Sequence, residues 1–239
     1  MVPIAPPPPP LLSGSAEGER VTKESSNNWS YEKDLRRAND RIWSFLGPSY
    51  DLSVIKTNFR LQNGPQCGLV VLELCCNLVG KNLNVTVEEL LSESQRLGFT
   101  RYGELFSCYS AYSLATNYLN RDRVELVTEL TPNKQEQMLN GLFDKRCVIL
   151  FPYDKGPDHG PVIRKGHSAH WCLLIGAAKS QRDLLVLVRQ GKSKWMGVYK
   201  WNDMLESNRN LVESSPTLTR DFITKPFCLA NTAIVIYTV

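Results

Sequence analysis

Five short apolar runs in the second half of the chain constrain the fold most. Each is rich in β-branched or aromatic residues and is bounded by turn residues, a pattern typical of β-strands. The runs are CVILFPY (147–153), HWCLLIGAA (170–178), DLLVLVRQ (183–190), WMGVYKW (195–201) and AIVIYTV (233–239). The first half carries helix signals instead. This order predicts an α+β fold, with helices segregated from an antiparallel sheet.

Five segments of the first half have the start and stop signals of helices. They span residues 31–47, 67–79, 85–98, 104–119 and 131–143. Thr86 and Glu89 have the spacing of a capping box, and Pro132 suits the first turn of its helix. In the first segment the apolar positions that we expect to face the core are Leu35, Ile42, Phe45 and Leu46.

The first 28 residues differ from the remainder of the chain. An unbroken proline run favours a polyproline II helix, and the residues around it are too polar to form a core. The segment is therefore either a flexible leader or a docking peptide for an aromatic groove of the SH3, WW or profilin type. The run consists of Pro6, Pro7, Pro8, Pro9 and Pro10. We predict a disordered proline-rich leader at 1–28 and one globular domain at 29–239.

Composition excludes several classes of protein. Hydrophobic content of 42% and charged content of 22% are ordinary for a soluble globular protein. No apolar run reaches the roughly 18 residues of a membrane span, and no signal peptide is visible at the N-terminus, so we expect a cytosolic or nuclear protein. In such a reducing compartment we expect the seven cysteines to be free thiols, most of them buried. A net charge of +4 is too small to indicate nucleic acid.

Cys67 is the first candidate for chemistry, because Gly64-Pro65 leads directly into it and an apolar helix follows. The start of a helix favours a thiolate through unpaired amides and the helix dipole. Gly68 removes a side chain beside the sulfur, which would let a substrate approach. The alternative is a buried structural cysteine, which we accept for Cys75, Cys76 and Cys108.

A nucleophilic cysteine needs a base, and the chain has three histidines, all between 159 and 170. His170 opens a predicted strand, from which an imidazole can face a helix start. His159 and His167 are expected to be exposed loop residues. A metal site built on His167, His170 and Cys172, with His159 as a fourth ligand, is a weak alternative, because the spacing matches no common zinc pattern.

Two further roles remain to be filled in such a site. Gln190, at the end of the next predicted strand, could orient the base, with Asp203 as a second possibility. The backbone amide of Cys67 could stabilise an oxyanion together with a side-chain amide. We favour Gln62 as the residue that supplies this side-chain amide, and Gln66 remains the alternative.

The stretches QNGPQCGL (62–69) and HWCLLIG (170–176) together resemble the papain-like cysteine peptidases. The likeness is closest to the branch of the bacteriocin-leader peptidases. Within that branch the proline run, GHSAHWCLLIGAA and RQGKSKW are similar to the actin maturation protease family. Two positions depart from the usual pattern. The glutamine precedes the cysteine by five residues instead of six, and glutamine stands where aspartate or asparagine is usual.

The resemblance implies a fold, a reaction and partners. The fold would be papain-like, with the nucleophile at a helix N-terminus packed on an antiparallel sheet. The enzyme would be a cytoplasmic cysteine aminopeptidase that removes the acetylated N-terminal Met or Cys of immature actin through an acyl-enzyme on Cys67. No cofactor is implied, and profilin would bind the proline-rich leader. Transpeptidation and deamidation share the acyl-enzyme step and stay open.

Basic residues surround the predicted strands that hold His170 and Gln190. If their loops share one rim with the catalytic pair, they would attract an acidic peptide. The residues are Arg164, Lys165, Arg189, Lys192 and Lys194. We expect Lys192 and Lys194, together with Gln66 and Gly68, to contact substrate. The alternatives are a solvated charged surface and, for the whole protein, a non-catalytic module that binds actin and profilin.

Overall fold

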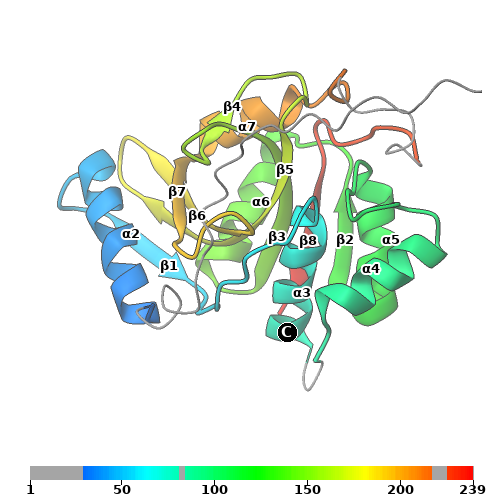
Figure 1. Ribbon diagram of the computed structural model, residues 1–239. Coiled ribbons are helices and arrows are strands. Elements are labelled where there is room, and N and C mark those ends of the chain that lie inside the picture. Colours follow the sequence, from blue (N-terminus) through cyan, green and yellow to red (C-terminus); the bar gives the residue numbers. More distant parts are fainter. Residues whose placement is uncertain (1–28, 81–83, 217–224, 239) are drawn as a thin grey trace, which may run out of the picture.

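A computed structural model describes residues 29–80, 84–216 and 225–238. Helices α2–α7 and one β-sheet form a single α+β body (Figure 1). The helices are α2 (Tyr31–Leu46), α3 (Cys67–Val79), α4 (Val87–Arg96), α5 (Cys108–Tyr118), α6 (Pro132–Phe143) and α7 (Trp201–Arg209). The strands are β1 (Asp51–Val54), β2 (Val124–Val127), β3 (Cys147–Lys155), β4 (Pro161–Val162), β5 (Ala169–Lys179), β6 (Leu184–Gln190), β7 (Gly197–Lys200) and β8 (Ala233–Tyr237).

The sheet is antiparallel, as the sequence predicted. Its main path runs β2-β8-β3-β5-β6-β7, while β4 pairs with β3 and β1 pairs with β5. Strand β5 is central, because β3, β6 and β1 all pair with it. The pairing of β5 with β6 has a bulge between Leu174 and Gly176. Gly176 lets β1 approach, since a Cβ there would lie 2.3 Å from the carbonyl oxygen of Ser53.

Helices cover both faces of the sheet, which corrects the expectation of helices segregated from it. Alternate residues of β3 and β5 enter two different hydrophobic cores. One core receives Trp171 and Leu173 together with α3, α4 and α5, and the other receives Leu174 together with α6 and α7. Figure 1 shows α2 beside β7 at one end of the sheet and α5 beside β2 at the other.

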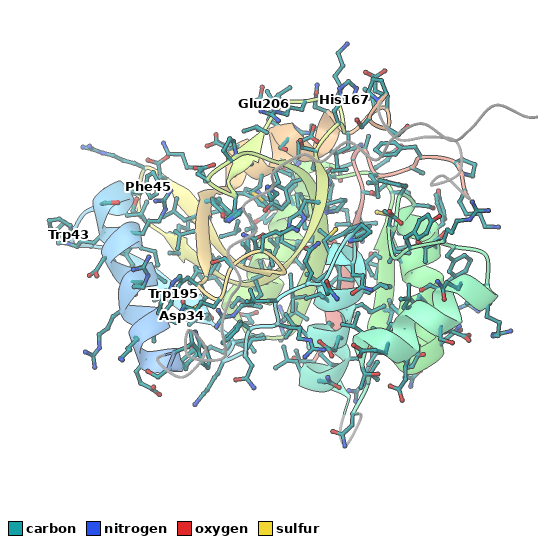
Figure 2. All side chains as sticks on the ribbon, viewed as in Figure 1. Asp34, Trp43, Phe45, His167, Trp195 and Glu206 are labelled. Carbon is teal, nitrogen blue, oxygen red and sulfur yellow. The ribbon has the colours of Figure 1, made fainter. Side chains whose placement is uncertain are left out.

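The predicted helices are all present, with ends close to the expected residues. The prediction for 67–79 is confirmed at both ends, and Thr86 and Glu89 form the expected capping box. In α2 the burial prediction is only partly right. Ile42 is buried, but Phe45 is 39% exposed, and the inner face also holds the charged residue Asp34. In Figure 2 Trp43 projects away from the body of the molecule, and its side chain is 60% exposed.

The five predicted strands correspond to β3, β5, β6, β7 and β8, although Trp201 begins α7 instead of ending β7. Strands β1, β2 and β4 were not predicted, because runs of two to four residues carry too little alternation. Among the described residues, no helix combines the length and the apolar character needed to cross a bilayer. The proline run and the predicted leader at 1–28 lie outside the described residues.

Candidate active site

Cys67 is the first residue of α3, directly after the Gly64-Pro65 turn. Gly64 has a φ of 67°, a left-handed conformation that glycine adopts without strain. The side chain of Cys67 is half-buried, and burial raises the pKa of its thiol. The backbone amides of Trp171 and Gly68 and the charge of Lys192 act in the opposite direction without reversing that shift. The expected activation by the helix start is therefore outweighed by desolvation, and the resting group is a thiol.

His170 and Gln190 are in direct contact. The imidazole Nε2 of His170 lies 2.9 Å from Oε1 of Gln190, and both side chains are buried. The bond places the hydrogen on Nε2, which leaves Nδ1 as the acceptor. Burial lowers the pKa of His170 to about 3, although the hydrogen bond to Gln190 raises it; the charges of Lys155 and Lys192 lower it further. The ring is therefore neutral near pH 7 and can accept a proton.

Trp171 fixes the strand that carries His170 against the helix that carries Cys67. Its indole nitrogen donates a hydrogen bond of 2.8 Å to the carbonyl of Leu105. A Cβ on Gly68 would meet Leu105 at 3.0 Å and Trp171 at 3.2 Å. The missing side chain of Gly68 therefore makes room for these two residues. This corrects the expectation that it leaves space for a substrate.

Cys67 and His170 line the same cavity, whose volume is about 470 Å³. That volume is in the range of sites for small ligands or a few residues of peptide. One wall comes from the segment before α5, and another comes from the loop before β5 and the ends of β3 and β6. The main contributors are Gln62, Pro65, Glu104, Leu105, Phe106, Lys155, Gly166, His167, Ser168 and Lys192.

The two candidate oxyanion glutamines are placed differently. Gln62 lines the cavity, its backbone amide donates to the carbonyl of Gly191, and its side-chain NH₂ donates to the carbonyl of Gly64. An amide NH₂ has two hydrogens, so one remains available to the cavity. Gln66 occupies the cap position of α3, and its side chain lies against Gly103, outside the cavity lining.

The expected basic rim is only partly correct. Lys192 lines the cavity, but Arg189 is fully buried beneath the sheet, and Lys194 places its ammonium 5.2 Å from the ring of Trp195. Arg164 and Lys165 are exposed on the loop before β5 and do not line the cavity. Lys155 at the end of β3, which the sequence did not single out, contributes the second ammonium.

Arg189 forms a buried ion pair with Asp34 of α2. Asp34 also accepts hydrogen bonds from the backbone amide of Met196 and the indole of Trp29, while Arg189 donates to the carbonyl of Thr57. In Figure 2 Asp34 lies on the side of α2 next to Trp195. The pair thereby joins α2 to the end of β6, which carries Gln190, and to the turn at 191–196, which carries Lys192.

Asp154 organises the loop on the other side of His170. It is fully buried, and its carboxylate accepts hydrogen bonds from the backbone amides of Arg164, Gly166 and Ser168 at 2.7–3.0 Å. Asp154 pairs with Ala169 in the sheet, one residue from the pair between Tyr153 and His170. The loop that borders the cavity is therefore tied to the strand that holds the imidazole.

The other histidines have separate environments. His167 is exposed and lies 2.9 Å from the Glu213 carboxylate, while His159 is half-buried in the β3–β4 hairpin. The residues of the weak metal alternative make different contacts, since His170 bonds Gln190 and Cys172 bonds the carbonyl of Phe151. Within the part of the chain that the structure describes, no three potential metal ligands cluster. Asp203 is exposed in the first turn of α7, and Gln190 occupies the position beside His170.

The family described as "Actin maturation protease-like, C-terminal domain" matches residues 57–178, which include Cys67 and His170. The chain belongs to this family. It is 31% identical to the actin maturation protease of Drosophila melanogaster over 176 residues, which are 72% of this chain and 62% of that protein. Proteins of the same name from Danio rerio and Mus musculus are 26% and 28% identical. Each match covers 67% of this chain, and 64% and 55% of those proteins, respectively.

The chain thus spans somewhat over half of the length of these relatives. The family match ends before Arg189 and Gln190. Sequence reasoning about this family member missed Lys155, Glu104 and Asp154. Lys155 and Asp154 do have a signal, because they are the only charged residues in the run CVILFPYDK. Glu104 has none, because nothing in the run around it distinguishes a buried carboxylate from an exposed one.

Proposed function

We propose that this chain is a papain-like cysteine peptidase that removes the acetylated N-terminal Met or Cys from immature actin. One observation carries the proposal: Cys67 at a helix start shares a cavity with His170, and Gln190 holds the imidazole from behind. A nucleophile, a base and a group that orients the base are the parts of a cysteine peptidase site. The relatives are named actin maturation proteases, which supports the protease activity and the link to actin.

In the first half-reaction the thiol of Cys67 attacks the carbonyl of the acetylated residue, and its proton passes to Nδ1 of His170. Nδ1 is the acceptor of that proton because Nε2 is bonded to Gln190, and burial keeps the imidazole neutral before the reaction. The imidazolium then protonates the leaving amine of the next residue. The products are a shortened peptide and a thioester on Cys67.

In the second half-reaction water attacks the thioester, and His170 accepts the proton from that water. The acetylated amino acid leaves, and Cys67 regains its hydrogen. In both steps the negative oxygen would receive hydrogen bonds from the amide of Cys67 and from the side-chain amide of Gln62. Gln62 is favoured over Gln66 because only Gln62 lines the cavity.

The proline-rich leader at 1–28 is proposed as the part that binds profilin, because a polyproline II helix presents a surface that aromatic grooves recognise. Residues 29–239 would then be the peptidase domain. A cytoplasmic location follows from the proposed substrate and from the seven free thiols, which suit a reducing compartment.

The test is intact-mass analysis of an N-acetylated peptide, Ac-Met or Ac-Cys followed by Asp and Glu, with wild type, Cys67→Ala and Cys228→Ala. Cys228 is the matched control, because it is the other thiol that is only partly buried. We expect wild type and Cys228→Ala to remove one acetylated residue and Cys67→Ala to remove none. Equal turnover by Cys67→Ala would refute the proposal.

The second candidate is a non-catalytic module that binds actin and profilin. It is favoured by one departure, Gln190 in place of the usual aspartate or asparagine, since glutamine is one methylene longer than either and lacks the charge of aspartate. Absence of cleavage of both peptides and of whole actin with profilin present, accompanied by binding of actin to the protein, would support this candidate.

A further inference from the structure

Two lysines border the cavity on the side of His170. Lys192 follows the end of β6 on an exposed turn, and Lys155 ends β3 and is partly buried. The turn of Lys192 is held close to the site, because the carbonyl of Gly191 accepts the amide of Gln62. The ammonium of Lys155 donates a bond of 3.2 Å to the carbonyl of Gly156, which uses one of its three hydrogens.

Both lysines line the cavity, and the charge of Lys192 acts on the ammonium of Lys155. The pKa of Lys155 is lowered by burial and then by the charge of Lys192. Among the described residues neither ammonium forms an ion pair with a carboxylate. The charge of Asp158 partly offsets this repulsion at Lys155, and an anion that binds in the cavity relieves it further.

The opposite wall has a different character. Leu105 and Phe106 are apolar and adjoin α3, which carries Cys67. Glu104 lies on the same wall and is 8% exposed; burial raises the pKa of its carboxyl, which favours the uncharged form. The cavity is thus apolar on the side of the nucleophile and basic on the side of the group that protonates the leaving amine.

We propose that Lys155 and Lys192 form a carboxylate-binding subsite for the acidic residue that follows the scissile bond, while Leu105 and Phe106 take the apolar side chain that precedes it. This inference rests on the proposed function for the direction of the peptide. It assigns acid specificity to two named residues, one from β3 and one from the turn after β6. An acidic side chain near both ammonium groups makes charge-assisted hydrogen bonds that an amide side chain cannot match.

The test compares two substrates, Ac-Met-Asp-Glu-Asp and its isosteric analogue Ac-Met-Asn-Gln-Asn, with wild type, Lys155→Gln and Lys192→Gln. Each substitution should lower kcat/KM for the acidic peptide by about tenfold, mainly through KM, and change it less than twofold for the neutral peptide. Lys179→Gln is the control, because it removes the same charge from the opposite end of β5. Equal losses with both peptides, or no loss with either, would overturn the subsite.

A second arm does not depend on cleavage. Binding of the free peptides Asp-Glu-Asp and Asn-Gln-Asn to Cys67→Ala is measured by calorimetry, with and without Lys155→Gln. Preferential binding of the acidic peptide, weakened about tenfold by Lys155→Gln, supports the subsite even if no peptide is cleaved. Cleavage of both substrates at equal rates by wild type, with equal binding of both free peptides, would refute the subsite and leave the peptidase proposal intact.

Discussion

Two buried carboxylates hold the segments on either side of His170, and they do so by different means. Asp34 is paired with a charged side chain, Arg189, and links the turn at 191–196 to α2, a helix more than 150 residues away in sequence. Asp154 receives three backbone amides from a loop that begins within ten residues of it. The loop before β5 is therefore organised locally, whereas the turn after β6, which carries Lys192, depends on a distant helix.

The largest expected effect comes from Arg189→Met. Removal of the guanidinium leaves the carboxylate of Asp34 buried without a counter-ion, which costs about 3–5 kcal/mol of unfolding free energy. Denaturant unfolding monitored by circular dichroism measures the loss. The double variant Asp34→Asn with Arg189→Met should recover part of it, because no buried charge remains. A double variant less stable than Arg189→Met would contradict a buried ion pair.

Asp154→Asn should lower the free energy of unfolding by less, about 2 kcal/mol. The asparagine has one carboxamide oxygen in place of two carboxylate oxygens as acceptor, and no charge is left unpaired. Hydrogen exchange should show faster exchange of the amides of Arg164, Gly166 and Ser168, with the turn at 191–196 unaffected. Asp158→Asn, an exposed site on the neighbouring hairpin, serves as the control. Faster exchange in both segments would show that the two are not held independently.

His170, between the two segments, should make stability depend on pH. Its pKa is lowered to about 3 in the folded protein, from about 6.5 when unfolded, so the unfolded chain binds the proton first as the pH falls. Stability is complete above pH 6.5 and is lost progressively toward pH 3, by about 2 kcal/mol between pH 6.5 and 5. This slope should disappear in His170→Gln and persist in His167→Gln, whose histidine is exposed. If the stability of His170→Gln depends on pH as steeply as that of wild type, the lowered pKa of His170 is refuted.

Gln190→Ala should have the smallest of these effects. It removes the hydrogen bond that fixes the ring of His170, and kcat should fall about tenfold while KM changes little. Gln190→Asn is a second variant for comparison. It keeps an amide that can accept a hydrogen bond, but the shorter side chain does not reach the ring of His170. Loss of substrate binding instead of turnover would show that Gln190 contacts the substrate and does not position the base.

The sequence predicts those parts of this site that local patterns encode. The start of α3 at Cys67 follows from Gly64-Pro65 and the apolar run after it, and His170 at a strand start follows from the run that it opens. The contact of Gln190 with His170 required only that β5 and β6 be neighbours. Arg189 was wrongly expected on the basic rim because its neighbours in sequence resemble a basic loop. Its partner, Asp34, lies on a distant helix, and sequence spacing does not predict that contact.

The thioester on Cys67 is the most direct test of the account. Wild type and His170→Ala are mixed with Ac-Met-Asp-Glu-Asp, quenched in acid after milliseconds to seconds and analysed by intact mass and peptide mapping. We expect wild type to carry an acetyl-methionyl adduct on Cys67 alone, and His170→Ala to form it at least about a thousandfold more slowly. An adduct mapped to another thiol, or equal rates in the two proteins, would contradict a Cys67–His170 pair.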